Sequence, residues 1–92
     1  MNKSQIDNLF KKGRKYYGSL IKVVAIPGDG EVIISAPIKT FPKAVDRNRV
    51  KRLLRLATKE VDFSKVNAFI IYNSPEIRSL DEITKDLKNI NF

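Results

Sequence analysis

The sequence predicts an α+β fold in one domain that spans residues 1–92. Apolar residues recur at helical spacing in three separate segments, and strand-like apolar runs lie between those segments. A chain of 92 residues is long enough for one domain with a modest core. One sheet with helices packed on it is the most economical way to bury these elements.

The first element is a helix that we expect to begin at Ser4 and to end at Gly13. Ser4 stands three residues before Asp7, a spacing similar to that of a capping box, and glycine commonly ends helices. The apolar positions of this segment fall on one helix face and are Ile6, Leu9 and Phe10.

Two or three strands follow the first helix. Residues 20–26 form an apolar run interrupted only by Lys22, and a short strand at 14–17 precedes them across Gly18. Residues 27–30 read Pro-Gly-Asp-Gly, which is typical of a turn, and residues 31–36 return as a strand. We therefore predict that strands 20–26 and 31–36 pair as a hairpin.

The next element is a long amphipathic helix. At about 100° per residue, its apolar positions lie on one side. They are Val50, Leu53, Leu54, Ala57 and Val61. The opposite side carries Asn48, Lys51, Arg52, Arg55 and Lys59, with Arg47 and Arg49 on the two shoulders. The pattern predicts a helix that docks by one stripe and presents a basic surface outward.

A short strand and a last helix complete the order. Residues 68–72 form an apolar run typical of a central strand, and Ser79 precedes Glu82 by the capping-box spacing. The apolar face of this last helix consists of Leu80, Ile83, Leu87 and Ile90.

The charge distribution indicates a polyanionic partner. The net charge is +8, and residues 39–59 hold eight basic side chains against the single acid Asp46. A smaller basic cluster comprises Lys11, Lys12, Arg14, Lys15 and Lys22. The chain has no cysteine and no histidine, which disfavours catalysis or metal binding by the protein itself. It also lacks a bilayer-length apolar run or a signal-peptide pattern, so we expect a cytoplasmic protein.

The basic segment resembles a known signature. Residues 43–55 read K-A-V-D-R-N-R-V-K-R-L-L-R, similar to the K-A-V-x-R-N-R-x-K-R-x-x-R motif of the bacterial ribonuclease P protein subunit. Residues 9–14 resemble the V-F-K-x-G-R segment of that family, and residues 67–72 resemble its D-Y-V-V-I-A strand. The resemblance covers residues 6–90, nearly the whole chain.

This resemblance implies a particular fold and function. The fold is an α-β-β-β-α-β-α sandwich of one four-stranded sheet and three helices, ribosomal-protein-S5-domain-2-like, with a left-handed βαβ crossover at the long helix. The function is that of an accessory subunit, monomeric as a protein, in the endoribonuclease that matures the 5′ end of tRNA. Such a subunit binds the catalytic RNA and the 5′ leader of precursor tRNA. The Mg²⁺-dependent hydrolysis takes place on the RNA, so no catalytic residue and no dedicated metal site are expected here.

The resemblance also implies roles for individual residues. RNA contact is implied for Lys43, Arg47, Asn48, Arg49, Lys51, Arg52 and Arg55. A leader cleft is implied between the sheet and the long helix, with Phe10 and Ile6 at the positions of two usual aromatic residues. Tyr17 is a further candidate, because a tyrosine beside basic residues can stack on a base, although a tyrosine at the start of a strand is more often a partly buried packing residue. Core packing is an equal alternative for Phe10.

The chain departs from the family pattern before the long helix. Pro42 replaces a glycine, and the loop at 35–39 is longer than usual, so the first phosphate contacts of this region are in question. Two other functions are alternatives to this one. A small structural RNA-binding protein, such as a ribosomal protein, would have a similar composition. An enzyme that uses Asp46 or Asp62 is disfavoured, because no two acids are spaced for a shared site.

Overall fold

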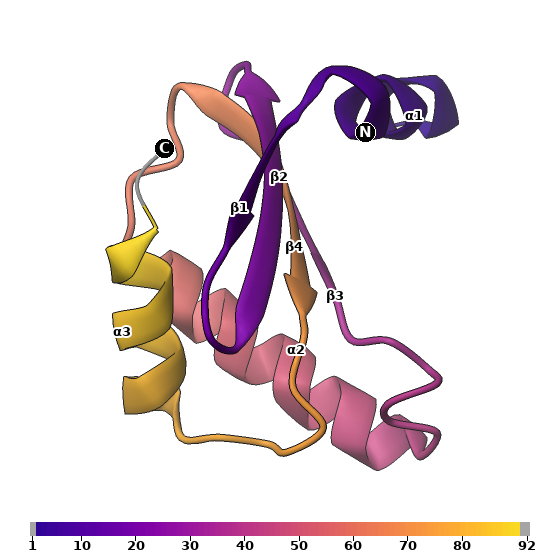
Figure 1. Cartoon of the computed structure of the whole chain (residues 1–92), viewed down its shortest axis with the longest axis vertical. Helices are drawn as coiled ribbons and strands as arrows, with labels where there is room; N and C mark the ends of the chain where they lie inside the picture. The colour runs from indigo at the N-terminus through magenta and orange to yellow at the C-terminus, as the bar shows by residue number, and fades with distance from the viewer. Residues whose placement is uncertain (1, 91–92) are drawn as a thin grey trace.

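A four-stranded sheet and three helices make up the fold in the computed structural model, which describes residues 2–90 (Figure 1). The helices are α1 (Lys3–Lys12), α2 (Ala44–Thr58) and α3 (Leu80–Asn89). The strands are β1 (Arg14–Tyr17), β2 (Ile21–Pro27), β3 (Val32–Ser35) and β4 (Val66–Tyr72). This order confirms the predicted α-β-β-β-α-β-α arrangement, including the short strand at 14–17.

The sheet is mixed, with the strand order β1-β2-β4-β3. β1 pairs with β2 and β2 pairs with β4 in antiparallel fashion, whereas β3 runs parallel to β4. The parallel pair requires a crossover connection, and α2 provides it. The most central strands, β2 and β4, carry the most continuous apolar sequences, as expected for strands covered on both sides.

The predicted hairpin between residues 20–26 and 31–36 is wrong, because β4 lies between β2 and β3. The hairpin of this sheet is instead β1–β2, in which Tyr17 is paired with Lys22 and the Gly18 N–H donates to the Ile21 carbonyl. The Pro-Gly-Asp-Gly segment does reverse the chain, as its composition indicates. Turn chemistry, however, specifies a reversal and not the strand that the returning segment will pair with.

The start of β4 shows what holds that turn. The side-chain oxygen of Asn67 accepts hydrogen bonds from the backbone N–H groups of Asp29, at 3.1 Å, and Glu31, at 3.0 Å. The N–H groups of Gly28 and Gly30 donate to carbonyls at the same end of β4. Gly30 has a φ of +93°, in the left-handed region that favours glycine. The turn therefore wraps around β4, which takes the place of the expected partner strand.

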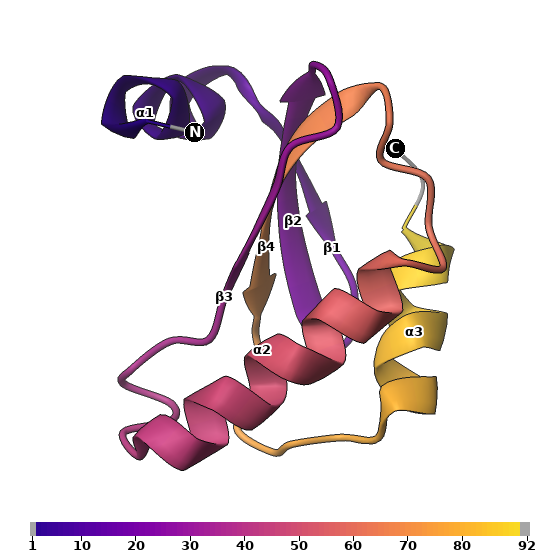
Figure 2. The ribbon, with the colours of Figure 1, turned by 180° about the vertical axis from the view of Figure 1, so that it is seen from behind.

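The two faces of the sheet are covered by different helices (Figures 1 and 2). α2 and α3 contact each other and pack on one face, while α1 contacts β2 and β4 from the other. The main core lies between the sheet and the α2–α3 pair. Its fully buried members are Ile21, Val23, Val50, Leu54, Ala57, Ala68, Ile70, Tyr72, Ile83 and Leu87.

Two details of the helices correct the sequence-based expectations. α1 begins at Lys3 and its N-cap is Asn2, not Ser4, because Asn2 and Gln5 form a reciprocal capping box with N···O distances of 2.9 Å. Ser79 caps α3 as expected, since its hydroxyl accepts from the Glu82 N–H. Leu80 is 37% exposed and does not join the buried face of α3.

Candidate nucleic-acid interface

The α2 helix separates an apolar stripe from a basic surface, as its sequence predicts. Val50, Leu54 and Ala57 are fully buried against the core. The exposed side carries the residues that we call the cationic ridge: Lys43, Asn48, Arg49, Arg52, Arg55 and Lys59. The predicted contact residues Arg47 and Lys51 are half-buried at the margins of this surface.

No acid among the described residues forms an ion pair with the ridge. Within residues 2–90, the ion pairs join Arg78 to Glu76 and Glu82, and Lys85 to Asp81. None of these pairs includes a residue of α2. Several unpaired cations on one rigid helix attract a polyanion, and the planar guanidinium groups among them can each hold a phosphate with two hydrogen bonds.

Arg47 differs from the other arginines of the motif. Its Nη1 donates hydrogen bonds to the carbonyl oxygens of Phe41, at 2.9 Å, and Pro42, at 2.8 Å. Phe41 itself is buried in the core beside Tyr72. Arg47 therefore fixes the end of the loop that leads into α2, a role that the sequence did not indicate. Helical periodicity places the residue on a shoulder of the helix but says nothing about which carbonyls the preceding loop presents.

The remaining candidates lie on the sheet face that contacts α1, which we call the α1 face. The strand register sets Tyr17, Lys22, Ile71 and Ser35 in one row across the sheet, and Lys15, Val24, Phe69 and Ile33 in the next. Side chains in such rows share one face. The half-buried or exposed members of both rows form a surface that is apolar in the middle and basic at the β1 edge.

Two aromatic contacts mark the α1 face. The ring of Phe10, which is 39% exposed, packs on the ring of Phe69 with a centroid separation of 5.1 Å. The Lys22 ammonium lies 5.4 Å from the centroid of the Tyr17 ring, which is 66% exposed. Phe10 and Tyr17 thus reach the same face from α1 and β1, and both leave ring surface open to solvent. Ile6 is half-buried on α1.

The implied position of a cleft between the sheet and the long helix is wrong. That space is filled by core side chains such as Leu54 and Ile70. Phe10 and Tyr17 lie on the opposite face of the sheet, so the structure separates the two groups of candidate residues. Periodicity within α2 could not reveal this separation, because it does not say which face of the sheet each helix covers.

The hairpin that carries Tyr17 is held by a carboxylate of α3. Asp86 accepts hydrogen bonds from three successive backbone N–H groups, those of Ser19, Leu20 and Ile21, at 2.7, 3.0 and 3.2 Å. A side chain at Gly18 would collide with the same carboxylate, because its Cβ would overlap Oδ2 of Asp86. The β1–β2 turn is therefore fixed against α3, and the position of Tyr17 with it.

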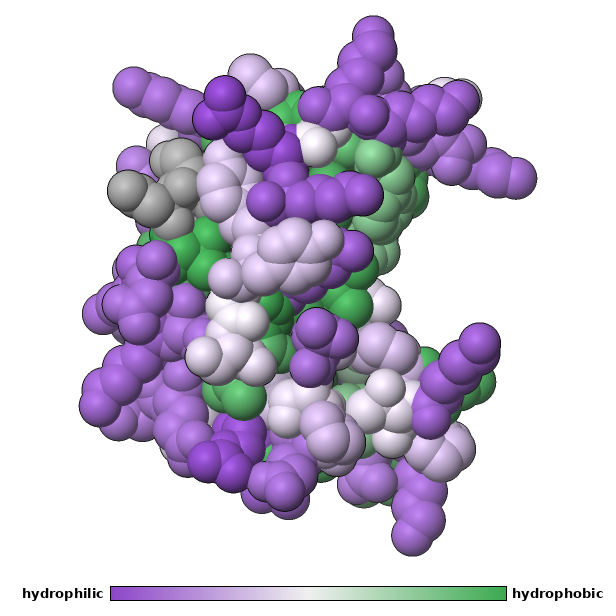
Figure 3. Space-filling view, in the orientation of Figure 1, coloured by the Kyte–Doolittle hydropathy of each residue, from purple (hydrophilic) through white to green (hydrophobic). Residues whose placement is uncertain are grey.

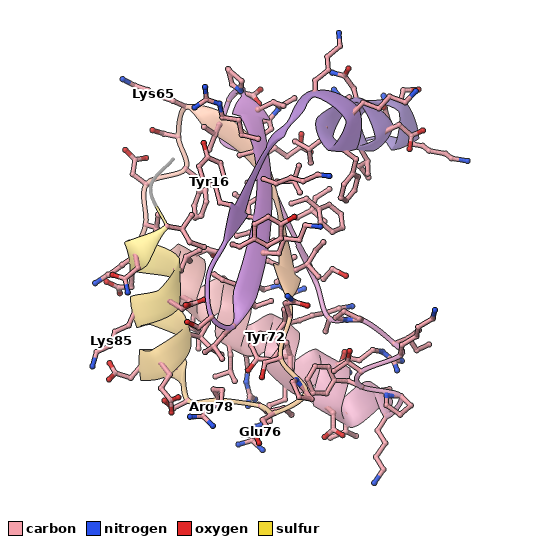
Figure 4. The ribbon with its side chains drawn as sticks, in the orientation of Figure 1. Tyr16, Lys65, Tyr72, Glu76, Arg78 and Lys85 are labelled. Atoms are coloured by element: carbon pink, nitrogen blue, oxygen red, sulfur yellow. The ribbon has the colours of Figure 1, made fainter. Side chains whose placement is uncertain are left out.

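The shifted pKa values have structural causes. Arg78 donates hydrogen bonds to Glu82 and Glu76, which lowers the pKa of Glu82 and raises that of Arg78 (Figure 4). The pKa of Asp62 is lowered mainly by its hydrogen bonds with Ser64. Asp62 is thereby held ionised on the surface, which does not suit it to act as a general acid.

Residues 2–90 contain no group of three or more acidic, cysteine or histidine side chains placed to hold a metal ion. In the same range no helix has the length and apolar character to cross a membrane.

Comparisons with known proteins agree with the motif. The ribonuclease P family model matches residues 1–90. The Staphylococcus aureus RNase P protein superposes with a TM-score of 0.81 at 21% sequence identity, covering 98% of this chain and 88% of that protein. The Thermotoga maritima RNase P protein, solved with 1-(4-fluorophenyl)-2-thiourea, gives a TM-score of 0.79 at 21% identity and covers 92% and 89%.

A search of curated protein sequences found no significant match. The structural likenesses establish the fold, and the family model, which spans nearly the whole chain, establishes the membership. The chain belongs to the ribonuclease P protein family.

Proposed function

We propose that this chain acts as one RNA-binding domain, the protein subunit of ribonuclease P. It binds the catalytic RNA and the 5′ leader of precursor tRNA and assists Mg²⁺-dependent removal of that leader. The observation that carries the proposal is the cationic ridge. Arg49, Arg52 and Arg55 are exposed on a helix whose other side is fixed in the core, and no acid of the described chain pairs with them.

The ridge suits the backbone of a folded RNA. Each guanidinium donates to phosphate oxygens in a fork, while the amide of Asn48 both donates and accepts, so that it reaches a base edge or a ribose. Lys43, just before α2, and Lys51, at the margin of the ridge, add to the positive charge of these arginines. Arg47 contributes charge too, but its main contact is with its own chain.

The α1 face suits a single strand such as the leader. Phe10 and Tyr17 offer open ring surface on which unpaired bases can stack, and Lys15 and Lys22 supply charge for the phosphates beside them. Ile6 offers apolar contact without stacking. This assignment places the leader on the face of the sheet opposite α2.

Catalysis belongs to the RNA in this proposal. Mg²⁺ bound by the RNA supplies the metal-assisted hydrolysis, while the protein supplies contacts and positive charge. Its side chains hold the RNA and the leader in place, and none of them transfers a proton or attacks the phosphate.

Reconstitution tests the function directly. Purified protein alone should leave precursor tRNA intact, whereas protein together with a bacterial ribonuclease P RNA and Mg²⁺ should remove the 5′ leader faster than that RNA alone. The comparison is made at an Mg²⁺ concentration where the RNA alone is slow. Cleavage by RNA-free protein that survives nuclease treatment, or no stimulation of the RNA, would refute the proposal.

A further inference from the structure

A hollow opens at the end of the sheet where α1 joins β1 and β2 ends. Its volume is about 400 Å³, and it is lined by Lys12, Arg14, Tyr16, residues 25–27 and Val66. It belongs neither to the cationic ridge nor to the two rows of the α1 face. Hydrophilic side chains gather over α1 and around this end of the molecule (Figure 3). We call this feature the corner hollow.

The strand register explains why the corner is open. Arg14 is the first residue of β1 and lies opposite Ala25, whose small side chain leaves space on the sheet surface. β1 has no residue opposite Ile26 or Pro27, so the last part of β2 is uncovered along that edge. The floor of the hollow is consequently apolar, while its rim comes from α1 and β1.

The rim is cationic and carries an aromatic ring. Lys12 and Arg14 are both exposed, and neither forms an ion pair within the described residues. None of the lining residues is acidic. Tyr16 projects from β1 on the side away from α1, and Lys65 lies at the same end of the sheet (Figure 4). The two cations, the tyrosine ring and the apolar floor therefore all border the same hollow.

We propose that the corner hollow binds one nucleotide of single-stranded RNA. Lys12 and Arg14 hold the phosphate, and the base lies on the apolar floor beside Tyr16, Pro27 and Val66. The volume is within the range of ordinary small-ligand sites. The two unpaired cations favour an anion such as phosphate. The apolar floor favours a flat, largely apolar group such as a base. A base can reach this floor only when it is not paired within a duplex, so the site favours single-stranded RNA. The site adds a third contact surface to the proposed function.

The test uses the full chain labelled with ¹⁵N and adenosine 5′-monophosphate as the probe. The amides of Gly13, Arg14 and Val66 should shift in a saturable way. Inorganic phosphate, which lacks the base, should bind about tenfold more weakly. The variant with Lys12→Ala and Arg14→Ala should weaken binding of the nucleotide about tenfold or more, because it removes both charge-assisted contacts.

Two control variants separate this site from the others. Lys39→Ala with Lys88→Ala removes the same charge elsewhere and should bind the nucleotide like the parent. Arg52→Ala with Arg55→Ala disables the ridge and should also keep the shifts at Gly13, Arg14 and Val66. A failure of the proposed function at the ridge is therefore distinguishable from a failure of the corner hollow.

Titration with a short single strand of RNA tests whether the bound nucleotide belongs to RNA or is a free mononucleotide. Tetra-adenylate should shift the same three amides at a lower nucleotide concentration than the monophosphate requires. Shifts confined to α2, or equal binding by the Lys12 and Arg14 double variant, would overturn the site. Binding of the monophosphate without any effect of tetra-adenylate on these amides would overturn its assignment to RNA.

Discussion

Arg47 is a residue of the motif whose hydrogen bonds in the structure are made with its own chain. Its guanidinium spans the carbonyls of Phe41 and Pro42, while the amides of Thr40 and Phe41 donate to the Pro37 carbonyl. The loop that leads into α2 is thus closed from both sides. Because Lys43 follows this loop directly, its placement relative to the ridge depends on the same contacts.

The substitution Arg47→Lys tests this role. The shorter lysine side chain would keep the positive charge but would lack the Nη1 position from which Arg47 donates to both carbonyls, so the loop should open more often. The amides of Thr40 and Phe41 should exchange with solvent faster, and RNA affinity should fall while its dependence on salt stays nearly unchanged. Hydrogen exchange and RNA titrations measure these effects. Arg49→Lys, at an exposed position, is the control; equal exchange in both variants would contradict the role.

A second pair of variants separates the ridge from the core. Arg52→Ala with Arg55→Ala should change stability by about 0.5 kcal/mol or less per site, because both side chains are exposed. Each lost phosphate contact should cost about 1–3 kcal/mol of RNA affinity. Leu54→Ala empties a fully buried position and should cost about 2–5 kcal/mol of stability.

Thermal melts and RNA titrations on the same samples distinguish these outcomes. The double arginine variant should be folded and bind RNA weakly, and Leu54→Ala should bind RNA only while it remains folded. Lys3→Ala with Lys88→Ala controls for the loss of two charges. The assignment of the two helix faces fails if the arginine variant unfolds or binds RNA like the parent.

The burial of a single residue can be predicted where the local sequence pattern determines it. The buried positions Val50, Leu54 and Ala57 follow from helical spacing alone. The N-cap of α1 does not follow from a local pattern, because Ser4 and Asn2 both have side chains suited to capping. Only the reciprocal hydrogen bonds between Asn2 and Gln5 decide between them. Leu80 fits the apolar periodicity of α3 but is not buried, because it is the first residue of the helix and lies outside the part that packs on the core.

Among the elements, the strands could be located but not paired from the sequence. The apolar runs and the turn residues mark β2, β3 and β4 within a few positions. Their neighbours in the sheet depend on contacts between distant segments, such as those of Asn67 with the 29–31 turn. Asn67 stands just before the predicted strand 68–72, so its place within β4 and its contacts with this turn are seen only in the structure.

The start of α3 allows a prediction about acid stability. Glu82 accepts a hydrogen bond from Arg78 at 2.8 Å, and its pKa is lowered relative to the ordinary value of 4.5. A lowered folded-state pKa stabilises the fold above the unfolded-state pKa, and this contribution is lost as the pH falls through the folded-state value. Denaturant melts on either side of pH 4.5 should therefore show a smaller acid-induced loss of stability in Glu82→Gln than in the parent.

The matched control for this prediction is Glu60→Gln. Glu60 is exposed near the end of α2 and forms no ion pair in the described part of the chain. This variant should keep the acid dependence of the parent. An equal change of the acid-induced loss of stability in both variants would mean that this loss depends on overall charge and not on the Arg78–Glu82 pair.

At the scale of the whole molecule, the sheet separates the surfaces proposed for RNA. α2 lies on one face of the sheet and α1 on the other (Figures 1 and 2). α2 carries the ridge, α1 and β1 carry the aromatic surface, and the corner hollow opens at one end of the sheet. The sequence indicates each basic group but not their arrangement, because strand alternation sends Arg14 and Lys15 to opposite faces. A protein so arranged can contact separate RNA segments at once.

The salt dependence of RNA binding tests how many phosphates these surfaces neutralise. Each phosphate contact contributes about 0.7–0.9 to the slope of log K against log salt concentration, so about six contacts, from the cations of the ridge and Lys51 at its margin, give a slope of about −4 to −5. Arg52→Ala with Arg55→Ala should reduce the steepness by about 1.5–2, whereas Leu54→Ala, measured where it is folded, should leave the slope unchanged. Titrations at several salt concentrations give the slope. A value near zero, or one insensitive to the two arginines, would show that the ridge is not the surface that binds RNA.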